Sequence, residues 1–408
     1  MMKMLMRIVR KRRRWPYILS VLLILAVYTA WSLLRPLPRL TGLPLSVPSQ
    51  NISPANILKW PAQGQAAVGI LGSSTLETHG QQAPLPTAST AKLITVLTVL
   101  ESRPLMLGQQ GPAIPLTAND VNIYNSYVAQ GGSVVKVQAG EQISEYQMLQ
   151  AILLPSANNI ADSLAIWAFG SLPAYQDAAK QYLAQHDLTQ TQIGSDASGY
   201  SPSTVSSAQD LVKVGELAMG NPVLASIVSQ ASVDGFPVVN TIKNVNWLLG
   251  TDGIVGVKTG NTDQAGGVYV SASRVTVNAQ PLTIVTAVTG LPSLAAALNQ
   301  SLPLIQSSQA SFQPVSFAKS GTTLGRYPLP WGGSVLAAID KNISLKTWAG
   351  KDPVTKVSLL PISLSTRAGS TVGQLHITIN TAQHYDFAIK LRSQPGPPSL
   401  GWRLRHPF

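Results

Sequence analysis

A serine and a lysine three residues apart open one of the most apolar stretches of the chain. Ser89 and Lys92 follow Pro86, and the run from Leu93 to Leu100 contains only aliphatic residues and threonine. If this stretch is a helix, positions i and i+3 lie on one face, one turn apart. A lysine in apolar surroundings favours its neutral form, and a neutral amine can take the proton of a neighbouring hydroxyl. The pair is therefore a candidate nucleophile with its general base.

The spacing alone does not single out this pair. The pattern Ser-x-x-Lys occurs three times, at Ser89/Lys92, Ser133/Lys136 and Ser316/Lys319. We expect Ser133 to Gln138 to form a strand, in which positions i and i+3 point to opposite faces, and Ser316 to lie in a linker. A lysine near a helix start also often extends its amine to water. The choice of Ser89 therefore depends on the other motifs.

A short polar turn between two predicted helices supplies a second group of candidates. The first helix begins after Ser144, where Gln147 completes a capping box, and it stops at Pro155. The turn Ser156-Ala157-Asn158-Asn159 follows, and a second helix is expected from Ile160 to Phe169. We expect a polar turn held between two apolar helices to keep its side chains in fixed positions.

A lysine, a threonine and a glycine supply a third group. Asp252 to Gly260 reads as a turn entering a strand that ends in Lys258-Thr259-Gly260. The other expected elements are strands at 65–71, 267–273 and 282–289, a helix from Asp210 capped by Ser206 or Ser207, and a helix at 293–308 with a break or kink at Pro303. These elements predict an α/β domain over residues 60–311, in which helices pack against an antiparallel sheet.

The composition changes beyond about Phe312. Short alternating strands between glycine and asparagine turns are predicted at 334–339, 356–362, 374–379 and 385–391. They predict a small all-β domain at 312–396, followed by a C-terminal tail at 397–408. The tail is too short to be a convincing amphipathic membrane helix, although Trp402, Arg403 and Arg405 are residues that can touch a membrane surface.

The N-terminus has the composition of a membrane anchor. Residues 1–15 form a basic tail, and residues 16–34 carry no charge over about the length that spans a bilayer. We expect one uncleaved transmembrane helix, with everything after it outside the cytoplasm. A cleaved signal peptide is the alternative, although Tyr28-Thr29-Ala30 is not a convincing cleavage site. Residues 35–59, rich in proline and serine, are interpreted as a semi-rigid tether.

The bulk composition excludes several classes of function. Of the net charge of +12, the first fourteen residues supply +7, and the remaining +5 does not indicate nucleic-acid binding. Cysteine is absent, which excludes disulfides, thiol catalysis and cysteine-ligated metals. The histidines stand in polar turns, at the chain end or in the predicted β-domain, so a Ser-His-Asp enzyme is not supported. We expect no metal and no cofactor.

Three motifs now stand in one order, Ser89-Thr90-Ala91-Lys92, Ser156-Ala157-Asn158 and Lys258-Thr259-Gly260. Together they resemble the active site of the penicillin-recognising serine enzymes. The flanking residues, among them Gly132-Ser133, Gly140-Glu141 and the segment from Asn261 to Gly266, are similar to the low-molecular-mass penicillin-binding proteins that are D-alanyl-D-alanine carboxypeptidases. The resemblance covers about 60–308, with a fainter likeness of about 318–392 to that family's C-terminal β-domain.

The resemblance implies a reaction and roles for the first two motifs. The substrates would be peptidoglycan stem peptides ending in D-Ala-D-Ala, with β-lactams as inhibitors. Ser89 would be the acylated nucleophile and Lys92 its general base. Ser156 would relay a proton to the leaving D-alanine, and Asn158 would bind the substrate amide and Lys92.

The third motif would bind the substrate. Lys258 and Thr259 would hold the terminal carboxylate, and Gly260 would leave room for the peptide along the strand edge. The backbone N–H groups of Ser89 and Asn261 would form the oxyanion hole.

Two departures from the family pattern stand out. Asn261 occupies the place where many relatives carry histidine, which bears on rate or pH dependence. Many relatives also carry a basic residue on the following strand, at a position that we align with Gln280 or Pro281. Arg274 is nearby in sequence. We therefore expect carboxylate recognition to be weaker or differently arranged.

Two other functions use the same scaffold. A class A β-lactamase also needs a glutamate that activates the deacylating water, and Glu216, the only glutamate between Asn158 and Lys258, has the wrong spacing. A non-catalytic wall-binding protein would not need all the catalytic side-chain types that are present here.

Overall fold

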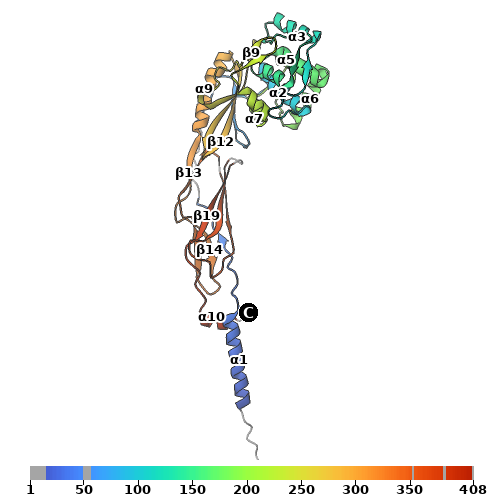
Figure 1. The fold of residues 1–408 in the computed structure, drawn as a ribbon. Coiled ribbons are helices and arrows are strands. Elements are labelled where there is room, and N and C mark those ends of the chain that lie inside the picture. Colours follow the sequence, from blue (N-terminus) through green and yellow to red (C-terminus); the bar gives the residue numbers. More distant parts are fainter. Residues whose placement is uncertain (1–14, 49–56, 352, 380–382, 407–408) are drawn as a thin grey trace, which may run out of the picture.

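The computed structural model describes residues 15–48, 57–351, 353–379 and 383–406. The basic residues between Lys3 and Arg14 lie outside these ranges. The molecule is elongated, with an apolar helix at one end, a β-rich domain in the middle and an α/β domain at the other end (Figure 1). This order matches the predicted fold class.

A five-stranded antiparallel sheet forms the centre of the α/β domain. Its strands are, in spatial order, β10 (Ile254–Thr262), β11 (Gly266–Val277), β12 (Gln280–Leu291), β2 (Gln65–Ile70) and β3 (Leu76–His79). Helix α9 (Leu294–Ala310) packs on one face and continues through Pro303, where a break or kink was expected. Helix α7 (Ala208–Gly220), capped by Ser207, packs on the other face. Because β10 is first in the spatial order of the strands, it is an edge strand.

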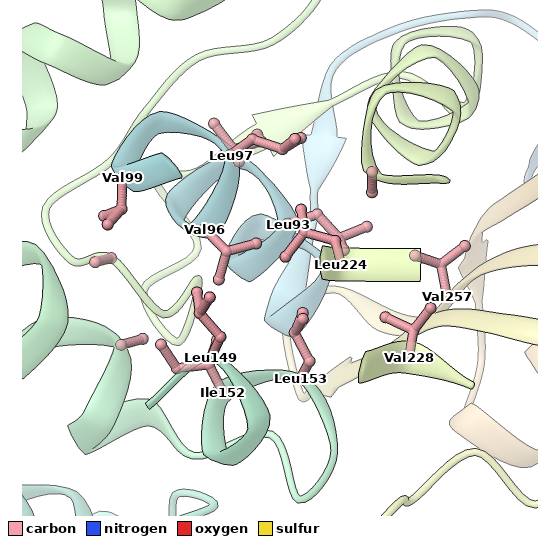
Figure 2. Close-up of a cluster of buried hydrophobic side chains, with 14 of the residues drawn as sticks. Leu93, Val96, Leu97, Val99, Leu149, Ile152, Leu153, Leu224, Val228 and Val257 are labelled. Carbon is pink, nitrogen blue, oxygen red and sulfur yellow. The ribbon is translucent and has the colours of Figure 1, made fainter. Parts of the chain in front are cut away.

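A group of helices covers the α7 side of the sheet. It comprises α2 (Ala91–Ser102), α3 (Ala118–Ala129), α4 (Glu145–Leu153), α5 (Asn158–Phe169), α6 (Leu172–Gln185) and α8 (Pro222–Val228). Every residue of α2 from Ala91 to Leu100 is buried. Figure 2 shows aliphatic side chains of α2 facing those of α4, α8 and β10. Because α2 lies inside this cluster, its first turn is held in a fixed place.

Three two-stranded sheets connect loop segments of this domain within the described residues. They are β4 (Leu85–Pro86) with β7 (Val205–Ser206), β5 (Ala113–Pro115) with β6 (Gln142–Ser144), and β8 (Ser232–Phe236) with β9 (Asn240–Lys243). The predicted capping box at Ser144 and Gln147 is present at the start of α4. The predicted strand at 133–138 does not form. Instead, the side chain of Asn159 hydrogen-bonds the backbone N–H and C=O of Val135.

The β-domain contains a six-stranded sheet and a two-stranded one, with a core of its own. The four predicted strands correspond to β15 (Ser334–Ala338), β17 (Val354–Leu359), β18 (Thr371–Ile379) and β19 (Gln383–Leu391). The sequence did not predict β13 (Phe312–Ala318), β14 (Thr323–Pro328) and β16 (Ile343–Trp348). Pro314 and Pro328 obscure the strand pattern in two of these three.

Part of the predicted tether belongs to the β-domain. Strand β1 (Leu43–Pro44) pairs with β14 at the edge of the large sheet, and the backbones of Leu40 and Ile362 exchange two hydrogen bonds. Leu40 is 3% exposed and lies in the β-domain core. The interpretation of 35–59 as a continuous tether was therefore wrong for residues 40–44.

The N-terminal helix is held at its C-terminal end by a short helix from the end of the β-domain. Helix α1 (Trp15–Leu34) is long and apolar enough to cross a membrane, a property that it shares with signal sequences. The short helix α10 (Leu400–Arg405) lies beside it (Figure 1). The Tyr28 hydroxyl donates to the carbonyl of Leu404 at 2.6 Å, and the Arg403 guanidinium donates to the carbonyl of Leu33. Helix α10 therefore contacts the C-terminal end of α1.

Replacing Leu40 tests whether the N-terminal segment is part of the β-domain. We expect Leu40→Ala to lower the free energy of unfolding by about 2–4 kcal/mol, because it leaves a cavity in a packed core. The matched variant Leu45→Ala changes a leucine that is 39% exposed, and it should change stability by less than about 1 kcal/mol. Urea denaturation of the detergent-solubilised protein measures both. Equal effects of the two substitutions would contradict this assignment.

Candidate active site

The candidate nucleophile lies in a tight turn just before α2. Ser89 is the middle residue of η1, a 3₁₀ turn (Ala88–Thr90), so it precedes the α-helix rather than opening it. Ala88 has φ +45°. The hydroxyl of Thr90 donates to the carbonyl of Thr87 at 2.7 Å, and the Thr87 N–H donates to the carbonyl of Thr204 at 3.1 Å. These contacts fix the direction in which the serine hydroxyl points.

The amine of Lys92 lies at the centre of the site. Its Nζ is 2.7 Å from the Oγ of Ser89, 2.6 Å from the Oδ1 of Asn158 and 2.9 Å from the carbonyl oxygen of Ser198. The side chain is fully buried. The structure therefore brings together Ser89, Lys92 and Asn158, as the sequence predicted.

These three contacts suit an ammonium that donates to all three oxygens, and they also suit a neutral amine. A neutral lysine amine has two N–H donors and one lone pair. The amide oxygen of Asn158 and the carbonyl of Ser198 only accept hydrogen bonds, so they take the two donors. The hydroxyl of Ser89 is the one neighbour that can donate, so its proton points to the lone pair. This is the arrangement of a general base beside its nucleophile.

Burial and charge both favour that neutral form. Desolvation is the main cause that holds the pKa of Lys92 well below its usual value, and the nearby charge of Lys258 lowers it further. The carboxylates of Asp196 and Asp162 act in the opposite direction and raise it. Burial also lowers the pKa of Lys258, to about 7.

The second and third motifs meet at Lys258. Ser156 lies between α4 and α5 with φ +67°, a left-handed conformation that is rare for residues other than glycine. Its Oγ accepts a hydrogen bond from the Nζ of Lys258 at 2.9 Å. The same amine donates to the carbonyl of Thr259 at 3.0 Å. A hydroxyl and a second lysine therefore stand next to the first pair.

Gly260 brings the edge strand against the nucleophile turn. A Cβ atom at Gly260 would lie 3.1 Å from the backbone nitrogen of Ser89 and 3.0 Å from the carbonyl oxygen of Thr87. The sequence predicted that this glycine leaves room for a peptide. In the structure the space beside it is taken by the turn itself, so the glycine lets β10 and Ser89 approach. Thr259 is buried.

A polar cavity of about 680 Å³ lies beside this group. Asn261 forms part of its wall together with Thr262, Tyr127 and Asp162. The side-chain oxygen of Asn261 accepts from the N–H of Leu294, at the start of α9.

The alignment of the expected basic position with Gln280 or Pro281 was wrong. Gln280 pairs with Val277 at the far end of the β11–β12 hairpin. The residue of β12 that shares a neighbour with Asn261 is Leu291, since both pair with Gly267. Arg274 also lies toward the far end, opposite Thr283. Lys258 is therefore the cation that the structure offers at this end of the sheet.

The other two Ser-x-x-Lys pairs lie on the surface and do not resemble the buried Ser89/Lys92 pair. Ser133 and Lys136 are exposed, and the backbone carbonyl of Ser133 serves to hold the N–H of Asn158 at 2.8 Å. Ser316 and Lys319 are exposed in and after β13.

Glu216 lies away from the candidate nucleophile. A Cβ at Gly69, on β2, would lie 2.4 Å from its carboxylate oxygen. It lines a separate cavity of about 690 Å³ with Leu97, Leu100 and Glu101, near the far end of α2. Burial raises its pKa to about 7. Its place in the structure does not allow it to activate a water at Ser89.

Sequence reasoning missed the contribution of Ser198. This residue supplies a backbone carbonyl, a group that every residue carries, so no side-chain motif indicates it. The nearest signal is Gly199, which has φ +69° and ends the tight turn that begins at Asp196.

The buried lysine gives a prediction for the pH dependence of stability. The pKa of Lys258 is about 7 in the folded protein and near 10.5 when unfolded, so between these values the unfolded state binds more protons. The free energy of unfolding therefore rises with pH in this window, by up to about 1.4 kcal/mol per pH unit. We expect Lys258→Met to lose the part of the rise that Lys258 contributes, while the part that the buried Lys92 contributes remains.

Urea denaturation at pH 7.5, 8.5 and 9.5 measures the slope. Lys180→Met is the control, because the side chain of Lys180 is 59% exposed. Identical slopes in the wild-type protein and Lys258→Met would show that the amine is not desolvated.

Comparison with known proteins agrees with this geometry. The profile of the D-alanyl-D-alanine carboxypeptidase family, peptidase S11, matches residues 70–288. The chain is 25% identical over 270 residues to the D-alanyl-D-alanine carboxypeptidase DacA of Escherichia coli, an alignment that covers 64% of this chain and 65% of that protein. It is 29% identical over 219 residues to DacB2 of Mycobacterium tuberculosis, covering 52% and 70%.

The fold is also shared with a solved structure. Penicillin binding protein 5 from Haemophilus influenzae superposes with a TM-score of 0.56 at 17% identity, over 84% of this chain and 99% of that one. This similarity includes the β-domain as well as the α/β domain. Since the family profile matches more than half of the chain, the protein belongs to the D-alanyl-D-alanine carboxypeptidase family of serine peptidases, peptidase S11.

Proposed function

We propose that this protein is a serine D-alanyl-D-alanine carboxypeptidase that removes the terminal D-alanine from peptidoglycan stem peptides. The observation that carries the proposal is the fully buried Lys92 amine, 2.7 Å from the hydroxyl of Ser89 and bonded otherwise to two obligate acceptors. This geometry supports acyl transfer to a serine, with lysine as base.

The first step forms an acyl-enzyme. Lys92 takes the proton of Ser89 as its Oγ attacks the carbonyl carbon of the penultimate D-alanine. The oxyanion that develops is stabilised by the backbone N–H groups of Ser89 and Asn261, and the N-terminal end of α2 adds favourable dipoles.

The leaving group needs a proton and a cation. As the C–N bond breaks, the hydroxyl of Ser156 gives its proton to the amine of the departing D-alanine, and Lys258, 2.9 Å from that hydroxyl, restores it. Lys258 and Thr259 also hold the terminal carboxylate. The free edge of β10 gives the peptide backbone a strand to pair with.

Hydrolysis completes the cycle. The proton that Lys92 took from Ser89 first passes to Lys258, so that both amines regain their starting forms. Water then attacks the ester carbonyl while Lys92 takes its proton, and Lys92 gives that proton to the Oγ of Ser89 as the ester bond breaks. β-Lactams acylate the same serine and are inhibitors in this proposal. Rapid β-lactam hydrolysis is not part of it, because Glu216 lies near the far end of α2.

We further propose that α1 is a retained membrane anchor, with both domains outside the cytoplasm. One observation supports retention: helix α10 is hydrogen-bonded to the C-terminal end of α1. A cleaved signal sequence has no need of such contacts.

Removing the nucleophile tests the reaction. We expect Ser89→Ala to reduce release of D-alanine from a pentapeptide ending in D-Ala-D-Ala by about a thousandfold or more, and to abolish labelling by a fluorescent penicillin. Ser133→Ala, in the second Ser-x-x-Lys pair, is the control and should retain wild-type activity. Mass spectrometry of the labelled peptide identifies the acylated residue. Activity that survives in Ser89→Ala would overturn the assignment.

The two lysines predict a bell-shaped pH profile for acylation. Acylation should rise as pH increases through the pKa of Lys92, since the neutral amine is the base. It should fall above about pH 7 as Lys258, whose pKa is about 7, loses the charge that holds the carboxylate. The two values describe a coupled pair.

Lys258→Met separates the two limbs. The alkaline limb should disappear, and the acid limb should move to higher pH, because the charge of Lys258 no longer lowers the pKa of Lys92. Rates of labelling by a fluorescent penicillin between pH 5 and 9 check this. An acid limb that stays in place would show that the two amines do not interact.

A further inference from the structure

A buried network behind Lys92 has no part in the steps described so far. It begins at the Ser198 carbonyl, the third contact of the Lys92 amine. It continues through the turn 196–199 to two side chains of the helical part, Tyr127 on α3 and Asp162 on α5. Neither side chain touches Ser89, Ser156 or Lys258 through a hydrogen bond that the structure shows.

Asp162 and Tyr127 hold this turn from the helical side. One carboxylate oxygen of Asp162 accepts the N–H of Ala197 at 2.9 Å, and the other accepts the hydroxyl of Tyr127 at 2.8 Å. The Tyr127 hydroxyl also lies 3.1 Å from the Oγ of Ser198. Asp162 is 6% exposed and Tyr127 is 7% exposed. Such a buried carboxylate is costly unless its bonds are satisfied, so the contact is specific.

The turn 196–199 in turn contacts the segment that carries the nucleophile. Asp196 accepts from both the N–H and the hydroxyl of Ser198 at 2.8 Å, which fixes the peptide that carries the carbonyl. On its other side the turn lies against η1, since a Cβ at Gly199 would be 2.1 Å from the carbonyl oxygen of Ala88. The same turn therefore contacts the base and the residue before the nucleophile.

We propose that Asp162 and Tyr127 are positioning residues for the acylation of Ser89: they hold the Ser198 carbonyl against Lys92 and so keep the amine directed at the serine hydroxyl. This inference rests on the proposed function. It assigns a role to a pair of side chains that no hydrogen bond in the structure joins to Ser89, Ser156 or Lys258.

The charge of Asp162 acts on the same amine. The charged groups around Lys92 are Lys258 on β10, Asp162 on α5 and Asp196 in the turn, and only the two carboxylates raise its pKa. Burial raises the pKa of Asp162 itself to about 6, and the Tyr127 hydroxyl opposes this rise. Above about pH 6 the carboxylate is ionised, and it offsets part of the effect of burial on Lys92. A base whose pKa falls too far becomes weak, so this offset supports proton transfer.

Two variants test the pair, with the rate of Ser89 labelling by a fluorescent penicillin measured from pH 5 to 9 on the full-length protein. Asp162→Asn keeps the shape but removes the charge, so the acid limb should move to lower pH by about one unit. Tyr127→Phe loosens the turn and lets the pKa of Asp162 rise above about 6, so the maximal rate, compared at a pH where the carboxylate is ionised, should fall about tenfold. Melting temperatures are recorded for each variant.

Matched controls separate positioning from general loss of stability. Asp210→Asn changes a buried carboxylate that holds a different loop, through the N–H of Gln190 at 2.7 Å. Tyr327→Phe removes a buried tyrosine hydroxyl in the β-domain, which donates to the carbonyl of Leu360 at 2.8 Å. Both should lower the melting temperature without moving the pH profile or the maximal rate of the folded protein.

The outcomes distinguish this inference from the proposed function. If wild-type protein is labelled at Ser89 but the Asp162→Asn and Tyr127→Phe profiles superimpose on it, the positioning role is wrong and the proposed function stands. The positioning role is also wrong if Asp210→Asn and Tyr327→Phe change the pH profile and the maximal rate as much as Asp162→Asn and Tyr127→Phe do. If Asp162→Asn does not fold, Tyr127→Phe decides alone. If wild-type protein is not labelled at Ser89, both proposals fail.

Discussion

A lysine amine in the interior is the constraint on which the rest of this site depends. A lysine side chain loses hydration when it is buried, and the protein must supply hydrogen-bond partners that suit the neutral form. Lys92 finds them in one amide oxygen, one backbone carbonyl and one hydroxyl. These come from three separate parts of the chain, so the base exists only when η1, α5 and the turn after α6 have packed together.

Two residues with positive φ and one glycine lie where these parts of the chain meet. Ala88 and Ser156, both with positive φ, lie in the turns that present the two catalytic hydroxyls of the proposed mechanism. Gly260 allows the edge strand to approach one of these turns from the other side. Such conformations cost free energy and persist only where the surroundings determine them. Here the buried length of α2 and the capped start of α4 supply that support.

The sequence predicted those features that depend on local chemistry. The capping box at Ser144 follows from side-chain types at short spacing. The approach of Lys92 to Asn158, which are 66 residues apart, was implied by the resemblance of the three motifs to a known family. It could not predict the Ser198 carbonyl, because a backbone group leaves no trace in composition. It assigned a strand to 133–138 because the alternation is real, whereas the partner is the side chain of Asn159. The misplaced position at Gln280 has a similar cause, since the length of the β11–β12 hairpin is set by tertiary pairing.

The pairing of β1 with β14 makes the α/β domain an insertion within the β-domain. Leu43 and Arg326, which face each other in that pairing, lie on either side of the whole α/β domain in the chain. During synthesis the α/β domain can therefore complete its core first, while β1 has no partner until β14 has been made. The last strands and the C-terminal helix then join the segment next to α1, so the domain nearest α1 is the last to be finished.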